Sequence, residues 1–582
     1  MAEKATVSLS VERNVAVPMR DGTVLYADVY RPSGPGPYPA LLTRSPYDKA
    51  STGAAPFTIR AATAGYAVVI QDVRGRFESE GEFYPFVNER QDGYDTLEWL
   101  ADQPWSDGKI GMFGGSYVGM TQWQAALSGH PALKAIVPNV TAANYHDGWA
   151  YQGGAFELQF NLSWTLSVLS INTALRANNG DLNSPAFQAI ADATDNMTSE
   201  FERLPLTGQP TFAEYARYYD DWVNHPTYDD FWSGLDVSRG WENIQAASFS
   251  IGGWHDIFLG GTIANYAGMS AAAGTDSGRH RLMVGPWNHG GMRLGNPIGD
   301  ANFGMRSTGA VIDEGGMHLR WYDRWLREVD NGYDSEPPVR LFVMGANRWR
   351  EGQSWPLENT DWQDWFLHSG GRANSQHGDG TLSRESPAGD PPDSFVYNPR
   401  NPVPTRGGGL CCNNVFSLGG AYDQRQVEQR EDVLVYTSAP LEKAREVTGP
   451  IKVILYASSS APDTDFTAKL VDVGPCGYAR NLTDGIIRAR YRESMTEATP
   501  ITPGEVTDYE IDLWATGNVF TEGHQIRVEI SSSNFPRFDR NPNTGELPGR
   551  SIEMVSALQT IHHSKEYPSR IVLPVINHPD VT

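Results

Sequence analysis

The stretch IGMFGGSYVG, residues 110–119, carries the strongest local signal in the sequence. Its first residues are apolar and predict a short buried strand, and a helical pattern follows from about residue 117 to 128. Gly114 and Gly119 remove side chains where this strand and helix meet, so the chain can turn sharply at Ser116. Such a turn exposes the Ser116 hydroxyl and sets the free N–H groups of a helix N-terminus beside it. The stretch therefore predicts a nucleophilic serine in an α/β protein.

The glycine spacing leaves a second interpretation open. Gly119 follows Ser116 by three residues, whereas the commonest nucleophile turn has its second glycine two residues after the serine. A turn of small residues also occurs in α/β proteins without catalytic activity. The motif by itself favours catalysis, and candidate catalytic partners elsewhere in the chain must decide between the two interpretations.

Strand and helix patterns alternate on both sides of this turn. Residues 8–32 alternate apolar and polar about a turn at residues 20–22, which predicts antiparallel edge strands. The remaining alternation predicts a parallel, doubly wound sheet with right-handed crossovers. Its expected strands are 39–42, 65–70, 110–113, 134–138, 247–252 and 280–285, with helices near 261–272 and 313–330.

The composition and the residue patterns divide the 582 residues into three parts. We expect an α/β-hydrolase catalytic domain at 1–144 and 241–355. Residues 145–240 are rich in aromatic side chains and helical patterns without a clear strand, which predicts an inserted helical cap. Residues 356–582 consist of short alternating runs separated by Gly, Pro, Asn and Asp, which predicts a jelly-roll β-sandwich, with long loops at 368–410.

Two later strands end in candidate partners for Ser116. Strand 247–252 leads to Asp256, and strand 280–285 leads to His289. Hydrolases of this architecture order the triad as serine, acid and histidine along the chain, on the sheet edge where strands end. His289 would take the Ser116 proton and Asp256 would orient its imidazole. His255 is the rival base. It is the weaker candidate because it is adjacent to Asp256 in sequence, so its side chain is expected to point elsewhere.

The oxyanion formed during acyl transfer needs two hydrogen-bond donors. The backbone N–H of Tyr117 is one by its position after the nucleophile. The second donor usually comes from the loop after the third strand, which here carries Tyr47. The residues alone leave open whether the Tyr47 phenol donates or only packs.

Composition excludes several classes of function. The net charge of −24 opposes binding to nucleic acid and to anionic membranes. The sequence has three cysteines, no leader pattern and no apolar run long enough to cross a bilayer, so we expect a cytoplasmic protein without a disulfide framework. No phosphate-binding or dinucleotide fingerprint occurs, and Asp463, Asp465 and Asp472 spread over both faces of a strand. We expect no cofactor and no metal; homo-oligomers remain possible.

Several long stretches, distributed over nearly the whole chain, carry a family resemblance. With them the chain resembles bacterial cocaine esterase and its relatives among the X-Pro dipeptidyl-peptidase-like hydrolases, which include α-amino-acid ester hydrolases. The stretches are residues 17–22 (VPMRDG), 45–49 (SPYDK), 71–83, 111–117 (GMFGGSY), 253–256 (GWHD), 284–289 (VGPWNH), 463–473 (DTDFTAKLVDV) and 531–536 (SSSNFP).

The resemblance implies the hydrolase domain, the cap, the jelly roll and the triad, and it favours the Tyr47 hydroxyl as an oxyanion donor. It also implies an acyl pocket bounded by Trp149, Trp164 and Phe258. On the jelly-roll side the matching residues are Leu410, Cys411 and Cys412, where cocaine esterase has bulky apolar side chains. These smaller residues predict a reshaped pocket, so cocaine is not the expected substrate. We interpret Cys411 and Cys412 as small apolar residues, ahead of a metal site or a vicinal disulfide.

The same comparison bears on substrates that carry an ammonium group. α-Amino-acid ester hydrolases hold that group with paired carboxylates, and residues 146–154 of this chain lack the pair. Asp147 or Glu157 would have to bind it alone.

The leading hypothesis is a serine carboxylesterase that cleaves a small ester with an apolar or aromatic acyl group through an acyl-enzyme on Ser116. An acylase, an α-amino-acid ester hydrolase or an X-Pro dipeptidyl-peptidase-like amide hydrolase is the alternative. A ligand-binding protein with a decayed hydrolase domain is the non-enzymatic alternative.

Overall fold

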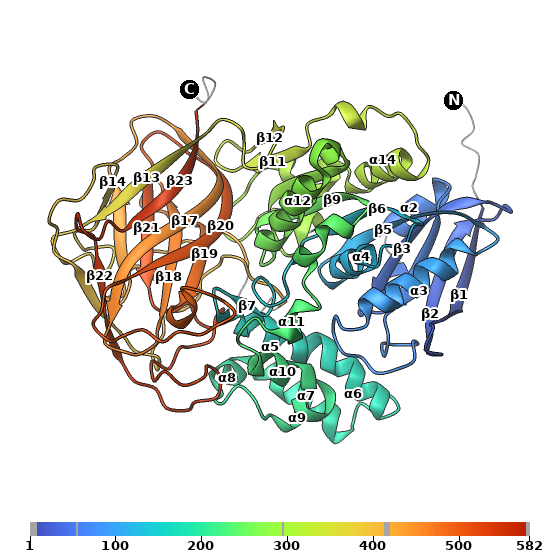
Figure 1. Ribbon diagram of the computed structural model, residues 1–582, viewed down its shortest axis with the longest axis horizontal. Helices are drawn as coiled ribbons and strands as arrows, with labels where there is room; N and C mark the ends of the chain where they lie inside the picture. The colour runs from blue at the N-terminus through green and yellow to red at the C-terminus, as the bar shows by residue number, and fades with distance from the viewer. Residues whose placement is uncertain (1–7, 54–55, 294–295, 413–418, 578–582) are drawn as a thin grey trace.

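The computed structural model describes residues 8–53, 56–293, 296–412 and 419–577 (Figure 1). Within them, a ten-stranded sheet with flanking helices lies on one side of the molecule and a domain of mostly sheet lies on the other. A group of short helices lies beneath both (Figure 1). In chain order these helices come after the first half of the sheet domain and before its second half.

The ten-stranded sheet has the order β1-β2-β4-β3-β5-β6-β9-β10-β11-β12. Its strands from β4 to β11 run parallel, while β1, β2 and β12 pair antiparallel at the two edges. The strands are β1 (Leu9–Pro18), β2 (Val24–Pro32), β3 (Tyr38–Ser45), β4 (Ala67–Asp72), β5 (Ser106–Gly115), β6 (Leu133–Asn139), β9 (Ala247–His255), β10 (His280–Asn288), β11 (Val339–Val343) and β12 (Arg348–Gly352). The predicted edge strands and parallel strands are confirmed.

Helices cover both faces of this sheet, because its central strands are apolar on both sides. Leu41 and Leu42 of β3 are both fully buried, yet they pack into two different apolar clusters on opposite faces. One face packs against α3 (Glu89–Ala101) and α4 (Tyr117–Leu127), and the other against α2 (Pro56–Thr63) and α14 (Glu314–Leu326). A further helix, α12 (Leu259–Ala273), packs beside β9 and β10.

The cap contains a strand pair that the sequence pattern did not reveal. Strands β7 (Tyr151–Gln152) and β8 (Ala155–Phe156) form a hairpin in which each strand has two residues. Its turn residues, Gly153 and Gly154, both have positive φ. A Cβ at Gly153 would lie 2.0 Å from the backbone oxygen of Ile486, so the hairpin packs directly on the C-terminal domain. The rest is helical: α5 (Leu158–Trp164), a π-helical turn at Thr165–Ser170, α6 (Ile171–Ala177), α7 (Pro185–Asp195), α8 (Met197–Glu202), α9 (Pro210–Tyr215), α10 (Arg217–Asn224) and α11 (Asp230–Ser233).

The C-terminal domain is mostly sheet, and β15-β22-β17-β23-β13-β14-β16-β21-β18-β19 form one hydrogen-bonded path, with β20 paired to β17. Its jelly-roll topology stays a prediction. Two short strands lie where long loops were expected, at β14 and β15. The strands are β13 (Thr360–His368), β14 (Thr381–Ser383), β15 (Asp393–Tyr397), β16 (Leu434–Ser438), β17 (Arg445–Ser459), β18 (Asp465–Val473), β19 (Ala479–Arg488), β20 (Thr507–Phe520), β21 (Gln525–Ser531), β22 (Ala557–His562) and β23 (Arg570–Ile576).

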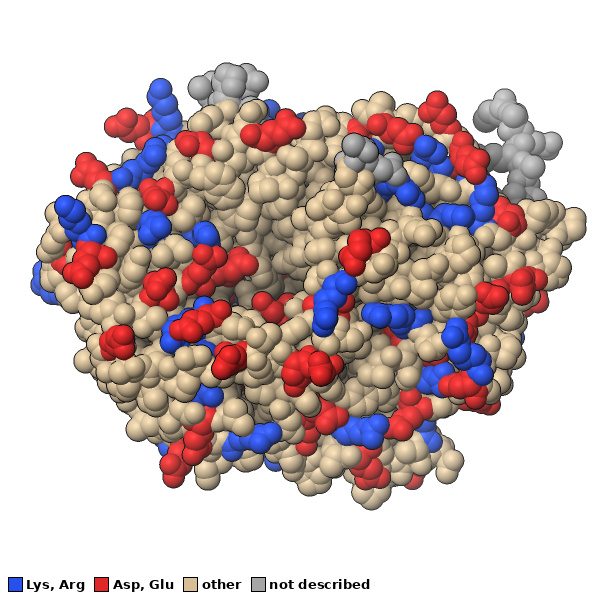
Figure 2. All heavy atoms as spheres, in the orientation of Figure 1, with Lys and Arg blue, Asp and Glu red and all other residues tan. Residues whose placement is uncertain are grey.

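Backbone hydrogen bonds join the C-terminal domain to the first sheet. The N–H of Met344 donates to the carbonyl of Gly517 at 2.8 Å, and the N–H of Val519 donates to the carbonyl of Met344 at 2.8 Å. The indole of Trp254 donates to the carbonyl of Phe342 beside this junction. The visible face of the molecule is hollowed between the two domains, and acidic and basic side chains are mixed across it (Figure 2). None of the described helices is both long enough and apolar enough to cross a bilayer.

Candidate active site

Ser116 occupies the sharp turn between β5 and α4, with φ of 61° and ψ of −129°. This strained conformation is typical of a nucleophile turn. Gly114 has φ of 130°, and a Cβ there would lie 2.3 Å from the Val118 side chain. A Cβ at Gly119 would lie 3.0 Å from the backbone oxygen of Asn139. Both glycines are therefore required by the close approach of strand and helix, and the wider glycine spacing still forms the turn.

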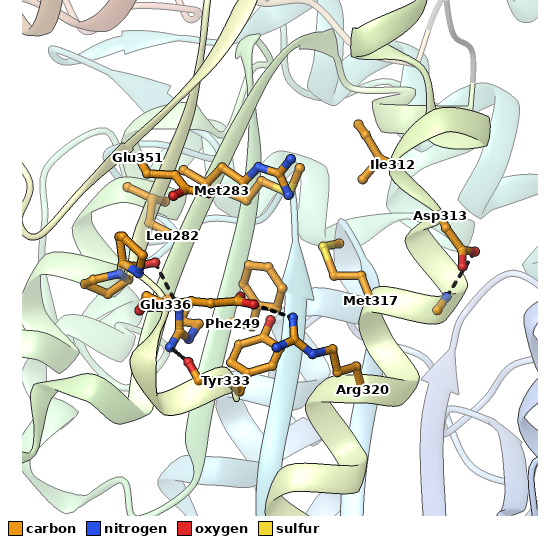
Figure 3. A pocket seen from close by; sticks show the side chains of 15 residues that line it. Phe249, Leu282, Met283, Ile312, Asp313, Met317, Arg320, Tyr333, Glu336 and Glu351 are labelled. Atoms are coloured by element: carbon orange, nitrogen blue, oxygen red, sulfur yellow. Dashed lines mark hydrogen bonds and ion pairs between the residues drawn. The ribbon is translucent and has the colours of Figure 1, made fainter. Parts of the chain in front are cut away.

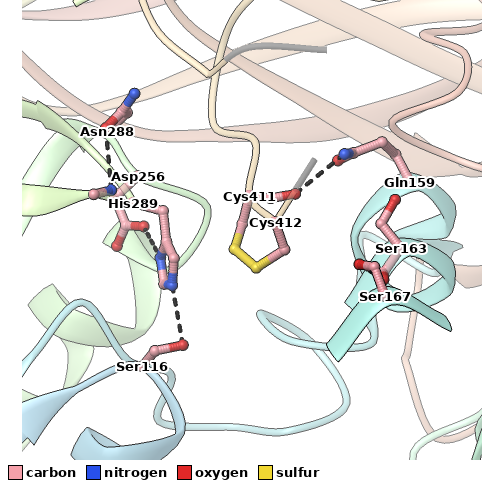
Figure 4. The surroundings of a disulfide bond; sticks show 10 residues. Ser116, Gln159, Ser163, Ser167, Asp256, Asn288, His289, Cys411 and Cys412 are labelled. Carbon is pink, nitrogen blue, oxygen red and sulfur yellow. Dashed lines mark hydrogen bonds and ion pairs between the residues drawn. A yellow bond between two sulfur atoms is a disulfide. The ribbon is translucent and has the colours of Figure 1, made fainter. Parts of the chain in front are cut away.

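Ser116, His289 and Asp256 form one hydrogen-bonded chain (Figure 4). The Nε2 atom of His289 lies 3.0 Å from the Ser116 Oγ, and the Nδ1 atom lies 2.7 Å from an Asp256 carboxylate oxygen. Asp256 is buried, whereas His289 keeps limited access to solvent. The three residues follow the ends of β5, β10 and β9, so the sheet edge brings together positions far apart in the sequence. This arrangement fits proton transfer from a serine nucleophile to an oriented imidazole.

His255 does not compete as the base. Its ring is fully buried beside Phe303, and burial lowers its pKa to about 3. Neither ring nitrogen has a hydrogen-bond partner among the residues that the structure describes. His255 therefore stays neutral and lies outside the serine–histidine–aspartate chain.

Both predicted oxyanion tyrosines lie beside Ser116, but they contribute different groups. The Tyr117 side chain is anchored away from the serine, since its hydroxyl donates to Glu89 at 2.8 Å and accepts from the Phe86 N–H at 3.0 Å. Only its backbone N–H at the start of α4 is placed to serve the oxyanion. The Tyr47 hydroxyl lies near the side chains of Trp164 and Ser116, and burial raises its pKa to about 12. At neutral pH this phenol keeps its proton and can donate.

Arg76 supports the Tyr47 loop and was not singled out as a site residue from sequence. Its buried guanidinium donates to the carbonyl of Pro46 at 2.9 Å and to the carbonyl of Leu169 at 2.8 Å. It also lies 4.8 Å from the ring centroid of Phe83. Arg76 thus links the residue before Tyr47 to the cap. The sequence signal that could have identified Arg76 is its position in the stretch 71–83, which carries part of the family resemblance.

Aromatic side chains form the wall on the hydrolase and cap side. The rings of Trp149 and Phe258 stack with centroids 4.3 Å apart, and Phe258 meets the His289 ring edge-on at 5.1 Å. Trp164 lies 5.5 Å from Trp149, and the ring of Phe160 packs against both indoles. The structure therefore brings all three predicted pocket residues of this side to the catalytic centre.

Cys411 and Cys412 form a disulfide, with Cα atoms 3.7 Å apart, so their interpretation as two separate apolar residues is wrong. The vicinal disulfide was the alternative ranked lower from sequence, because two adjacent cysteines are equally compatible with free thiols. The bond lies beside His289, and Gln159 donates to the backbone oxygen of Cys411 at 3.1 Å (Figure 4). Leu410 is buried but is not part of the apolar cluster that contains Trp149, Phe258 and Cys411.

The two acids proposed as single ammonium anchors have different surroundings. Glu157 is buried and pairs with Arg537 at 3.3 Å. Asp147 is exposed and accepts the Gly153 N–H within its own turn at 3.0 Å. The acids of the C-terminal stretch are also paired, with Asp463 to Arg490, Asp465 to Arg488 and Asp472 to Arg480.

A separate cavity of about 270 Å³ lies between α14 and the end of the first sheet (Figure 3). Several of its charged residues have partners, since Arg320 pairs with Glu336 and Arg281 donates to backbone oxygens of Glu336 and Pro337. The part of its lining that the structure describes holds no serine, cysteine or histidine.

The fold and the triad define a serine hydrolase of the α/β-hydrolase type. Residues 21–291 match the family model "X-Pro dipeptidyl-peptidase (S15 family)", and residues 331–572 match "X-Pro dipeptidyl-peptidase C-terminal non-catalytic domain". The chain is 41% identical to cocaine esterase of Rhodococcus sp. (strain MB1 Bresler), over 97% of this chain and 99% of that protein. It therefore belongs to the X-Pro dipeptidyl-peptidase-like family of α/β-hydrolases that includes cocaine esterase.

Two solved structures extend the comparison. An aminopeptidase from a marine sediment archaeon, Thaumarchaeota archaeon, superposes with a TM-score of 0.79 at 27% identity and covers 99% of both chains. An α-amino acid ester hydrolase superposes with the same TM-score and identity, over 99% of this chain and 98% of that one. The architecture is thus shared with relatives whose names differ in substrate.

Proposed function

We propose that this protein is a carboxylesterase that hydrolyses small esters with an apolar or aromatic acyl group. The observation that carries the proposal is the Ser116–His289–Asp256 chain, which faces a wall built from Trp149 and Phe258. Aromatic surfaces bind apolar acyl groups by removing them from water. The name of the 41% identical relative, cocaine esterase, supports ester hydrolysis.

The proposed reaction has two acyl-transfer steps. Ser116 attacks the ester carbonyl while His289 Nε2 takes the Ser116 proton, and the carbonyl oxygen becomes an oxyanion between the Tyr117 N–H and the Tyr47 hydroxyl. The C–O bond to the alcohol then breaks, and His289 returns the proton to that leaving oxygen. Water attacks the acyl-enzyme in the same way, with His289 as base, and the carboxylic acid leaves as Ser116 regains its proton.

α-Amino-acid ester or amide hydrolysis is the second candidate, since both solved relatives at TM-score 0.79 carry such names. Of the two candidate anchors, Glu157 already pairs with the cation Arg537, which would compete with a substrate ammonium, and Asp147 is exposed and accepts the Gly153 N–H. We therefore rank it below hydrolysis of uncharged esters. The proposal requires a small ester as its only partner.

Two experiments test the proposed function. A fluorophosphonate probe should label the purified protein once, at Ser116, and Ser116→Ala should abolish both labelling and hydrolysis of phenyl acetate. A panel of benzoyl esters, acetyl esters, α-amino esters and X-Pro amides then ranks the substrates by kcat/KM. A preference for substrates with a free α-amine would reject the proposal in favour of the second candidate.

A further inference from the structure

The disulfide of Cys411 and Cys412 lies directly beside the catalytic histidine (Figure 4). Both sulfur atoms and a ring nitrogen of His289 all lie within 4.8 Å of one another. Cys411 is buried and Cys412 is half-buried. The pair belongs to the C-terminal domain and His289 to the hydrolase domain, so the cluster forms only in the complete fold.

The peptide that carries the pair is held in place on both sides. Gly408 and Gly420 exchange backbone hydrogen bonds at 2.8 and 3.0 Å, which closes the base of the loop. The side-chain amide of Asn288, the residue before His289, donates to the backbone oxygen of Gly419 at 3.0 Å. Gln159 holds the carbonyl of Cys411 from the cap. These contacts do not depend on the sulfur–sulfur bond, so they can keep both sulfurs beside His289 after that bond is broken.

We propose that the reduced form of Cys411 and Cys412, together with His289, binds a thiophilic divalent cation such as Zn²⁺ or Cd²⁺ and that this binding switches the hydrolase off. Two thiolates and one imidazole are a donor set that Zn²⁺ prefers, at about 2.3 Å to sulfur and 2.0 Å to nitrogen. Those bond lengths place ligand atoms roughly 3–4 Å apart in a tetrahedral site. The two sulfurs, bonded to each other in the disulfide, therefore move apart after reduction, and their separations from the His289 nitrogen, now at most 4.8 Å, shorten slightly.

The hydrogen bond from His289 to Asp256 strengthens the assignment. Asp256 holds Nδ1 at 2.7 Å, so Nε2 is the nitrogen that faces Ser116. A carboxylate on the far nitrogen is the usual support of a metal-binding histidine. The same Nε2 must accept the Ser116 proton in catalysis, and a nitrogen bonded to a cation cannot accept it. Metal binding and hydrolysis therefore exclude each other.

The two states differ by a balanced redox step. A dithiol reductant transfers two electrons and two protons to the sulfur–sulfur bond, which yields two thiols and converts the dithiol into a cyclic disulfide. Each thiol then releases its proton to solvent as the cation binds. In the disulfide form neither sulfur has a thiolate to offer, so the oxidised enzyme stays active in the presence of the metal.

The test measures metal binding and hydrolysis separately. Cys476 is exposed and unpaired, so the experiment uses Cys476→Ser as the parent protein to remove its thiol. The protein is reduced with a dithiol, freed of reductant without air, and titrated with Cd²⁺. We expect one equivalent to bind with the ultraviolet absorption of cadmium–thiolate bonds, with at least about a tenfold loss of esterase activity that a chelator reverses. The oxidised parent should show neither effect.

Single variants identify the ligands. Cys411→Ser and Cys412→Ser, each in the Cys476→Ser parent, should bind Cd²⁺ at least about tenfold more weakly than the reduced parent. His289→Gln should also bind Cd²⁺ at least about tenfold more weakly. Losing a residue that only supports a metal ligand already weakens binding by about that factor. Because binding is read from absorption, this comparison holds even where the ester substrate is wrong. The inference is overturned if the dithiol cannot reduce the pair in the folded protein, or if Cd²⁺ gives the same signal in the parent and in both cysteine variants.

Discussion

Two sides of the catalytic centre, called here the catalytic wall and the opposite wall, are built on different principles. The catalytic wall consists of residues that follow the ends of β5, β9 and β10, and its geometry comes from regular strands fixed by a buried sheet. The opposite wall, with Cys411 and Cys412, comes from a loop of the C-terminal domain closed by Gly408 and Gly420. Regular elements hold groups within the tolerance that proton transfer needs, whereas loops change shape with few substitutions. We infer that the first wall fixes the chemistry and the second shapes the substrate range.

Arg537 connects these two parts. Its buried guanidinium donates to Asp484 of the C-terminal domain at 2.8 Å and to Gln152 of the cap at 2.9 Å, and it also pairs with Glu157 at 3.3 Å. One cation thus joins the C-terminal domain to the cap hairpin that follows Trp149 in the chain.

The largest expected effect is on the catalytic wall. Asp256→Asn should lower kcat by about 10⁴-fold, because an amide no longer fixes the imidazole tautomer or stabilises its cation. His255→Gln is the matched control, and steady-state kinetics on phenyl acetate should show kcat within a few-fold of the wild type. Equal losses in the two variants would reject the assignment of Asp256 as the acid.

Breaking the connection between the walls should be costly in stability. Arg537→Met should lower the free energy of unfolding by about 3–5 kcal/mol, since it leaves the buried carboxylates of Asp484 and Glu157 without their cation. The exposed pair of Lys452 and Glu510 provides the control. Lys452→Met should cost less than about 1 kcal/mol. Urea unfolding followed by tryptophan fluorescence measures both, and a small effect at Arg537 would mean that the interface is held by its apolar contacts.

The oxyanion tyrosine should have a smaller but purely catalytic effect. Tyr47→Phe removes one donor and should lower kcat by roughly 10²–10³-fold, with KM little changed. The unfolding midpoint should stay near that of the wild type, because the ring and its packing on Tyr117 remain. A loss of only a few-fold would leave Tyr47 with a packing role.

The sequence was sufficient for the catalytic wall because its signals are local. The strand before Ser116, the glycines around it and the acid and histidine after later strands each follow from short patterns, and sheet topology then brings them together. The fold class and the order of elements followed from the same alternation. The two-residue hairpin at Tyr151–Phe156 escaped because it is too short for a periodic pattern and is stabilised by tertiary contacts with Ile486.

The opposite wall was less predictable for the same physical reason. No residue pattern shows whether Cys411 and Cys412 are bonded, since that depends on the backbone conformation of an irregular loop. Arg537 was also missed as a connecting residue, because its partners are side chains from distant parts of the chain. A charged residue in a sequence is first expected on a solvated surface, and only the folded structure shows that its side chain is buried.

Glu157 offers the most subtle test of how the walls are joined. Burial raises its pKa to about 7 despite Arg537, and its second oxygen has no partner in the described part of the chain. Between the ordinary glutamate pKa of 4.5 and about 7, the folded protein holds a proton that the unfolded chain has lost. The stabilisation is therefore complete below pH 4.5 and is lost as pH rises through about 7. Glu157→Gln should remove this loss.

Relative to the wild type, the unfolding free energy of Glu157→Gln should increase by up to about 3 kcal/mol between pH 4.5 and pH 8. The exposed Glu505→Gln should instead follow the wild-type curve. Urea titrations across that range measure the difference. A variant that falls behind the wild type as pH rises would show that the ionised Glu157–Arg537 pair outweighs the cost of burying it, and that the two walls are joined by charge rather than by a neutral hydrogen bond.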